Sequence, residues 1–221
     1  MSKRSWRWIL GWAIALILLL LLAGLSAPLV LRCRKKAEQT EAVSNARQIG
    51  LALFEFEKHY GRYPDDSTAG LVREATSTSL KLGFATSNDC FRQLIASEIM
   101  QSEIPFYAKT TSSRRPDNVF SGSHALEKGE VAFAYIAGLS SAKAHPRAPL
   151  VLTPLVPGKR LFDIKSSKKY FNGKAIILHA DNSVRSYPVD SSGHVWIDGK
   201  NLFDPSQPFW GGKVPDVKWP E

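Results

Sequence analysis

His179 and Asp181 come closest, by residue type and spacing, to a catalytic pair. An imidazole beside a carboxylate is a common composition for a general base. However, Asp181-Asn182 is typical of a turn, and His179 ends an apolar run typical of a strand. We therefore interpret His179 as a strand residue, and His59 as a solvated or interfacial residue of a helix. The sequence contains no P-loop, zinc-ligand spacing or GxSxG motif, so we expect no enzymatic activity.

The two cysteines, Cys33 and Cys90, allow at most one disulfide. A bridge would require the end of an apolar span and a later helix to meet, and the sequence leaves open whether they do. One bridge excludes a disulfide-stapled mini-protein. The length of 221 residues allows one mid-sized domain, alone or with an appendage.

The net charge of +9 suggests nucleic acid as a partner, but the distribution of the charges along the chain argues against a nucleic-acid partner. Seven of the 29 basic residues flank the apolar span, and all 20 acidic residues follow it. The chain beyond Lys36 therefore holds 22 basic and 20 acidic residues and is nearly neutral. We expect no nucleic-acid partner, and we expect the two basic clusters to meet anionic headgroups of a lipid bilayer.

The segment 8–31 contains no ionisable residue. As a helix it would be about 36 Å long, enough to cross a hydrocarbon core of about 30 Å. This predicts a transmembrane helix after a basic amino-terminal tail, residues 1–7. The positions that mark the predicted span are Trp8, Gly11, Leu20, Pro28 and Leu31.

A cleaved signal peptide is the alternative for this segment. Its apolar run exceeds the roughly 7–15 residues typical of cleavable signals, and Pro28 follows the small residues that would precede a cut. A retained signal anchor is therefore the better interpretation. Both flanks are basic, so the positive-inside rule does not give the orientation.

Residues 32–60 are predicted to continue the helix with one apolar face. The face is formed at spacings of three and four by Ala42, Ala46, Ile49, Leu53, Phe56 and Tyr60. Gly61 and Pro64 are expected to end it. This stripe predicts packing on the chain's own downstream domain, since it is too short for a stable coiled coil.

Residues 61–221 are predicted to form an α+β domain with helices first and a small antiparallel sheet after them. Helices are expected at 69–75 and from a cap at 87–89 to about residue 100, and a surface loop at 109–130. Strands are expected at 131–137, 149–153 and 194–197. The clearest hairpin joins 174–180 to 183–188, and the glycine- and proline-rich tail is expected to be irregular.

The stretch SNARQIGLALFEFEKHYGRYP, at the end of a long amino-terminal helix, resembles the type IV pilin and type II secretion pseudopilin family. Weaker similarity extends over SNDCFRQLIASEI, RRPDN, ALEKGEVAFAYIAGLSS and GKAIILHADNSVRSYPVD. The resemblance implies a pilin-like fold, a bacterial inner-membrane location with a periplasmic domain, and pseudopilins or secretion-assembly proteins as partners. The matching family-motif residues are Asn45, Arg47, Gln48, Ile49, Gly50, Tyr60, Gly61 and Pro64.

The sequence departs from that family at the processing site. The family carries a cleaved Gly followed by an apolar residue, with Glu at the fifth position after the cut. Here Gly11-Trp12 is present, but the fifth position is Leu16, and no carboxylate occurs in the span. This predicts an unprocessed, permanently anchored, pseudopilin-like protein.

The resemblance also raises calcium as a cofactor, since some pseudopilins bind it in carboxy-terminal loops. The weak candidates are Asp181, Asp190, Asp198 and Asp204. Their spacing matches no EF-hand, and acidic residues in turns usually cap those turns. We therefore expect no resident metal or cofactor.

Two functions follow. The first is a non-enzymatic role in type II secretion, pilus-like assembly or envelope interaction. The alternative is a membrane-tethered envelope module that binds a ligand and is unrelated to secretion. Its ligand surface would be the aromatic residues of the tail, unless these pack on the sheet: Trp196, Phe203, Phe209, Trp210 and Trp219.

Overall fold

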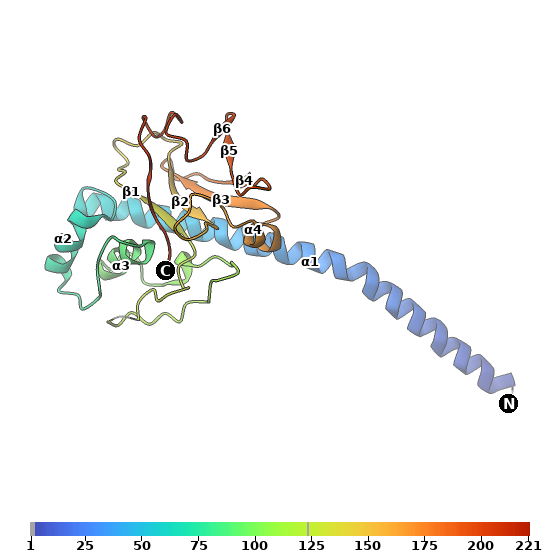
Figure 1. Cartoon of the computed structure of the whole chain (residues 1–221). Helices are drawn as coiled ribbons and strands as arrows, with labels where there is room; N and C mark the ends of the chain where they lie inside the picture. Colours follow the sequence, from blue (N-terminus) through green and yellow to red (C-terminus); the bar gives the residue numbers. More distant parts are fainter. Residues whose placement is uncertain (1–2, 123) are drawn as a thin grey trace.

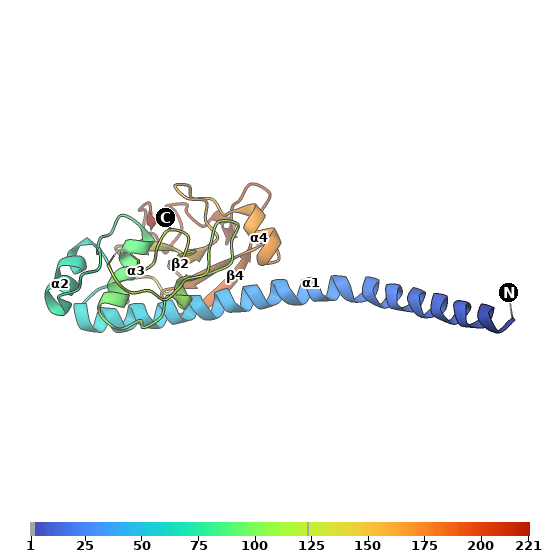
Figure 2. The same cartoon turned by 90° about the horizontal axis from the view of Figure 1, so that it is seen from below.

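The computed structural model describes residues 3–122 and 124–221. It is an α+β fold built around one very long helix, α1 (Lys3–Tyr60), which runs the length of the molecule (Figures 1 and 2). The other helices are α2 (Asp66–Thr76), α3 (Ser87–Ala96), the 3-10 turn η1 (Ile104–Phe106) and α4 (Ile164–Tyr170). The α+β class and the antiparallel sheet are as predicted.

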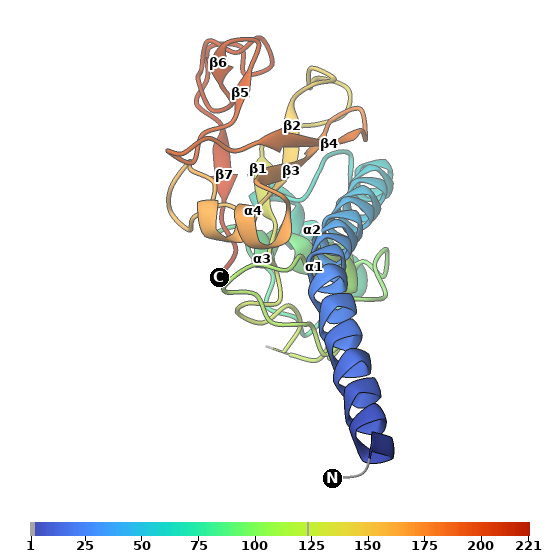
Figure 3. The same cartoon turned by 90° about the vertical axis from the view of Figure 1, so that its right-hand side faces the viewer.

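The main sheet has five antiparallel strands in the order β4-β3-β2-β1-β7. The predicted hairpin is confirmed as β3 with β4, which pair Ile177 with Arg185. A separate β5–β6 pair lies away from the helices, at the top of Figure 3. The strands are β1 (Ala134–Ala137), β2 (Pro149–Thr153), β3 (Lys174–His179), β4 (Val184–Pro188), β5 (Trp196–Ile197), β6 (Lys200–Asn201) and β7 (Asp216–Lys218).

Helix caps set the beginnings of α2 and α3. Asp65 and Thr68 form a capping box at α2, which begins at Asp66, three residues before the predicted start at residue 69. The cap of α3 is Thr86, one residue before the predicted 87–89, and its partner is Asp89. Because α3 ends at Ala96, it is shorter than the predicted helix.

The carboxy-terminal half of α1 packs on the sheet. It contacts β2, β3 and β4 on one side of the domain, with α4 and η1 beside it. The predicted apolar stripe is confirmed as its buried face, except that Tyr60 is half-buried and stacks on Phe56 at 4.5 Å. The buried members are Ala42, Ala46, Ile49, Leu53 and Phe56.

The amino-terminal half of α1, here called the arm (residues 3–31), extends beyond the domain as a continuous, gently curved helix (Figure 2). Every side chain that the structure describes in it is exposed, and the large apolar ones are 50% to 73% exposed. Trp8, Gly11 and Leu20 are among the exposed residues. The side chains of Pro28 and Leu31 lie outside the described ones. Lys3–Arg7, predicted as a tail, belong to the helix, and Met1 and Ser2 lie outside the described residues.

Among the residues that the structure describes, no helix is both long enough and apolar enough to cross a membrane. The predictions of a transmembrane helix over 8–31, a signal anchor and a single-pass inner-membrane location with a periplasmic domain are therefore wrong. The expected partnership with a lipid bilayer stays a prediction.

Gly50 on α1 lies against the β3–β4 turn. A Cβ on Gly50 would lie 2.1 Å from Asn182 Oδ1 and 3.1 Å from both δ-methyl groups of Leu178. We expect Gly50→Val to lower the free energy of unfolding by about 1–3 kcal/mol, because the added atoms overfill this contact. Urea denaturation of the full chain measures it.

Gly70→Val is the matched control, since Gly70 is also helical and nothing lies within 4 Å of its added Cβ. It should change the free energy of unfolding by less than about 0.5 kcal/mol. Equal losses in both variants would mean that the effect comes from helix propensity and not from the contact with the β3–β4 turn.

Candidate functional site

The family-motif residues lie where α1 joins the domain. Asn45 is buried and donates from Nδ2 to the carbonyls of Ile104, at 3.1 Å, and Tyr107, at 2.8 Å. Ile49 is buried beside it. These contacts tie η1 to α1, so the buried part of the motif positions the domain on the helix.

The end of the motif forms the corner after α1. Gly61 has φ of +79° and donates its N–H to Glu57 O, which ends the helix at the predicted residue. The Pro64 carbonyl accepts a hydrogen bond from Tyr135 on β1 at 3.0 Å. Arg47, Gln48 and Gly61 are the exposed members of the motif, and Arg47 and Gln48 are those with long side chains. They are therefore the motif residues that another protein could contact.

The arm is the most unusual surface of the protein. The run Gly11–Leu22 makes more than three helical turns, so its exposed apolar side chains cover every face of the helix. Leu16, the position where the family that the motif resembles has Glu, is 58% exposed. A helix that is apolar on all faces is normally buried, so this surface is the main candidate for association with other chains.

His179 is held as a structural residue. It ends β3, as predicted, and is 2% exposed. Its Nδ1–H donates to Arg147 O at 2.8 Å, and its Nε2 accepts from the Tyr187 hydroxyl at 3.1 Å. Burial lowers the pKa of His179, which keeps the ring neutral. With both nitrogens engaged, no lone pair is left for a general base.

The other chemically notable residues are also separate from one another. His59 is exposed, and its Nε2 lies 3.3 Å from Glu55 Oε1. Cys33 is exposed and Cys90 is buried, and both thiols are free. The structure brings none of them to His179.

The four aspartates predicted as weak calcium candidates each serve their own turn or ion pair. Asp181 accepts from Ser183 N, Asp204 from Ser206 N, and Asp190 from the N–H groups of Ser192, His194 and Trp196. Asp198 pairs with Arg147 at 2.9 Å. The structure does not bring these aspartates together into one site.

The aromatic residues of the tail are mostly core residues. Phe203, Phe209 and Trp210 are 6% to 7% exposed, and Trp210 donates to Leu202 O. Trp219 is half-buried and donates to Lys159 O, which leaves Trp196 as the exposed one, at 54%. The contiguous aromatic surface that a ligand-binding module would need is therefore not present in the tail.

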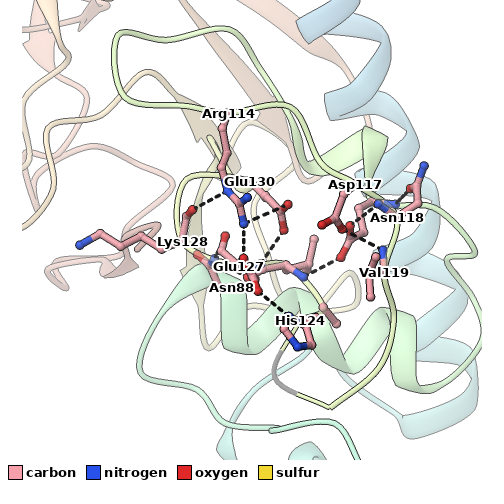
Figure 4. A network of polar contacts seen from close by, with 12 residues as sticks. Asn88, Arg114, Asp117, Asn118, Val119, His124, Glu127, Lys128 and Glu130 are labelled. Atoms are coloured by element: carbon pink, nitrogen blue, oxygen red, sulfur yellow. Dashed lines mark hydrogen bonds and ion pairs between the residues drawn. The ribbon is translucent and has the colours of Figure 1, made fainter.

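A carboxylate group that the sequence does not predict lies in the long loop before β1 (Figure 4). One oxygen from each of Glu103, Asp117 and Glu130 lies within 4.8 Å of the others. Glu103 and Glu130 are fully buried, whereas Asp117 is exposed. We call these three residues the carboxylate triad.

Glu103 organises the loop around the triad. Its two carboxylate oxygens accept from Leu126 N at 2.6 Å and Asn118 N at 2.9 Å. Burial, with the nearby charge of Glu130, raises the pKa of Glu103 against the opposing effect of these hydrogen bonds. Arg92, from α3, fixes the same loop by donating to Ala125 O and Leu126 O.

No protein-family model, curated protein or solved structure matches this chain. The similarity to pilins and pseudopilins thus remains a prediction that rests on the motif residues themselves. The candidate surfaces therefore have to be interpreted from their own geometry. They are the apolar arm, which extends beyond the domain, and the carboxylate triad within the domain.

The triad is the feature that sequence reasoning missed. Its members are 13 to 27 positions apart and match no ligand spacing. Asp117 and Glu130 lie in the segment 109–130 that is predicted as surface loop, and Glu103 lies before it. The one available signal is the pair Glu127 and Glu130 beside apolar Val131–Ala137, which predicts a partly buried carboxylate at the start of a strand.

Proposed function

We propose that this protein is a non-enzymatic, pseudopilin-like assembly protein that associates through the arm with the helices of similar chains. The observation that carries the proposal is the exposure of apolar side chains on every face of Gly11–Leu22. A single seam, as in a two-stranded coiled coil, would cover one stripe only. An arm that is apolar all round needs several neighbours, as helices in the core of a pilus-like assembly have.

The joint between α1 and the domain supports the same role. Asn45 and Gly50 hold the domain on the carboxy-terminal half of α1, which leaves the arm free to pack with others. The exposed motif residues Arg47 and Gln48 lie on the side of the helix away from the domain. The partners we propose are therefore further copies of this chain or pseudopilins of a type II secretion or pilus-like system.

The test is the association state of the full chain in sedimentation velocity. The variant carries Leu18→Lys and Leu21→Lys, at positions 60% and 58% exposed, where a charge disturbs no contact within the chain. We expect the native chain to sediment as oligomers and the variant to shift to the monomer, because charged groups are costly to bury between apolar helices.

Val214→Lys is the control, because Val214 is 57% exposed but lies in the domain. It should sediment like the native chain. A native chain that is monomeric at all concentrations, or oligomers that survive the double substitution, would contradict association through the arm. Retention of other pseudopilins by the native chain, and not by the double variant, would extend the result to heterologous partners.

A further inference from the structure

The carboxylate triad carries more negative charge than its surroundings neutralise. Arg114 is the cation beside it, with Nη2 3.3 Å from Glu130 Oε1, but the same guanidinium is paired closely with Glu127. The other partners of the triad are neutral backbone N–H groups, those of Leu126, Asn118, Val119 and Glu127. Like charges gathered at a buried position disfavour the ionised state unless a cation joins them.

Glu130 supplies a second, separate indication of a missing ligand. Its side chain is 0% exposed, and Oε2 accepts from Glu127 N at 2.7 Å. Oε1 is buried and, among the residues that the structure describes, receives no hydrogen bond. The contact with Arg114 lacks hydrogen-bond geometry, since that group is directed to Glu127. Figure 4 draws the ion pair of Arg114 with Glu130 as a dashed line, and the carboxylate of Asp117 lies on the other side of the Glu130 carboxylate, where Arg114 does not reach.

We propose that Glu103, Asp117 and Glu130 bind a divalent cation and that Ca²⁺ fits best. The donors are all carboxylate oxygens, which suit hard cations. Ca²⁺ binds oxygens at about 2.3–2.6 Å, so two of its ligands lie up to about 5 Å apart, which accommodates separations within 4.8 Å. Mg²⁺ requires a near-ideal octahedron and gives up its waters reluctantly, which suits three carboxylates from separate parts of a loop less well. Asp117 is exposed and forms the solvent side, where water completes the coordination.

The ion would act on the loop as a clamp. Glu103 adjoins η1, Asp117 lies in the middle of the loop, and Glu130 precedes the strand region at β1. One ion would therefore join three points that are otherwise linked through backbone hydrogen bonds. This role is independent of the arm, so the cation site can exist whether or not the chain assembles.

The experiment titrates the full, metal-free chain with CaCl2 in a calorimeter and follows thermal unfolding with Ca²⁺ and with EDTA. We expect saturable binding and a higher Tm with Ca²⁺, with weaker binding of Mg²⁺. Asp117→Asn should weaken Ca²⁺ binding at least tenfold, and because Asp117 is exposed this variant should fold normally. Glu130→Gln should do the same, provided that its circular dichroism matches the native chain.

Glu127→Gln is the matched control: it removes a neighbouring carboxylate that contacts Arg114 and His124 but does not belong to the triad. It should leave the Kd for Ca²⁺ within about twofold. Extracellular calcium modules bind at about 10⁻⁴–10⁻³ M, so absence of binding at about 10 mM Ca²⁺ would overturn the proposal. Equal binding by Asp117→Asn and the native chain would overturn it too.

Discussion

Replacing Phe56 with alanine is expected to lower the free energy of unfolding by about 3–5 kcal/mol. Phe56 is 0% exposed on the face of α1 that packs against the domain, and its ring stacks on Tyr60 at 4.5 Å. The substitution removes the buried ring and leaves a cavity between the helix and the domain, which the surrounding sheet can fill only in part. Urea denaturation of the full chain, followed by circular dichroism, measures the change.

Leu51→Ala is the matched control on the same helix. Leu51 lies five residues earlier and is 58% exposed. Its truncation should cost less than about 0.5 kcal/mol, since exposed positions contribute little burial. Similar losses for the two variants would mean that α1 is not held to the domain by the apolar stripe.

Replacing Arg92 with methionine is expected to cost about 3–5 kcal/mol, because it removes one partner of a buried ion pair. Arg92 is 5% exposed and donates to Ala125 O at 2.7 Å, to Leu126 O at 3.0 Å and to Asp89 at 2.7 Å. Methionine fills much of the volume, but two buried carbonyls and one carboxylate lose a charged donor. The loop before β1 should also become more sensitive to limited proteolysis.

Arg115→Met provides the comparison for that loss. The Arg115 side chain is 69% exposed and lies 3.9 Å from Glu41, so it makes an exposed ion pair of small value. Its removal should change the free energy of unfolding by less than about 1 kcal/mol and leave the proteolysis pattern unaltered. A small effect of Arg92→Met would show that the loop does not depend on α3.

The sequence predicts those parts of the fold in which a periodic apolar pattern is followed by a residue that ends a helix or forms a turn. The apolar stripe of α1 and its end at Gly61 follow from helical periodicity and from a glycine with positive φ, and the β3–β4 hairpin follows from two apolar runs around Asp181-Asn182. The strand β7 in the tail cannot be predicted from local sequence, because it has three residues and exists only through its pairing with β1. The short, lysine-rich α4 has no apolar periodicity to reveal it.

For the candidate sites, too, contacts between residues close in sequence are predictable, and contacts between residues distant in sequence are not. The turn-capping roles of Asp181, Asp190 and Asp204 depend on neighbours within a few residues, and sequence reasoning anticipates them. The carboxylate triad depends on how the chain folds back from Glu103 to Glu130, which no local spacing encodes. Composition alone gives a wrong prediction for segment 8–31. Its apolar residues predict a membrane span, but no helix of the described residues qualifies as one.

The most direct test of the proposed assembly is cross-linking through the arm of the full chain. Leu18→Cys is combined with Cys33→Ser, and Cys90 stays unreactive because it is buried and burial raises the pKa of its thiol to about 12. With a short bismaleimide, association through the arm predicts cross-linked dimers from the Leu18→Cys chain and mostly monomer from Val214→Cys in the same background. Monomer from the Leu18→Cys chain, at concentrations where the native chain is oligomeric, would contradict it.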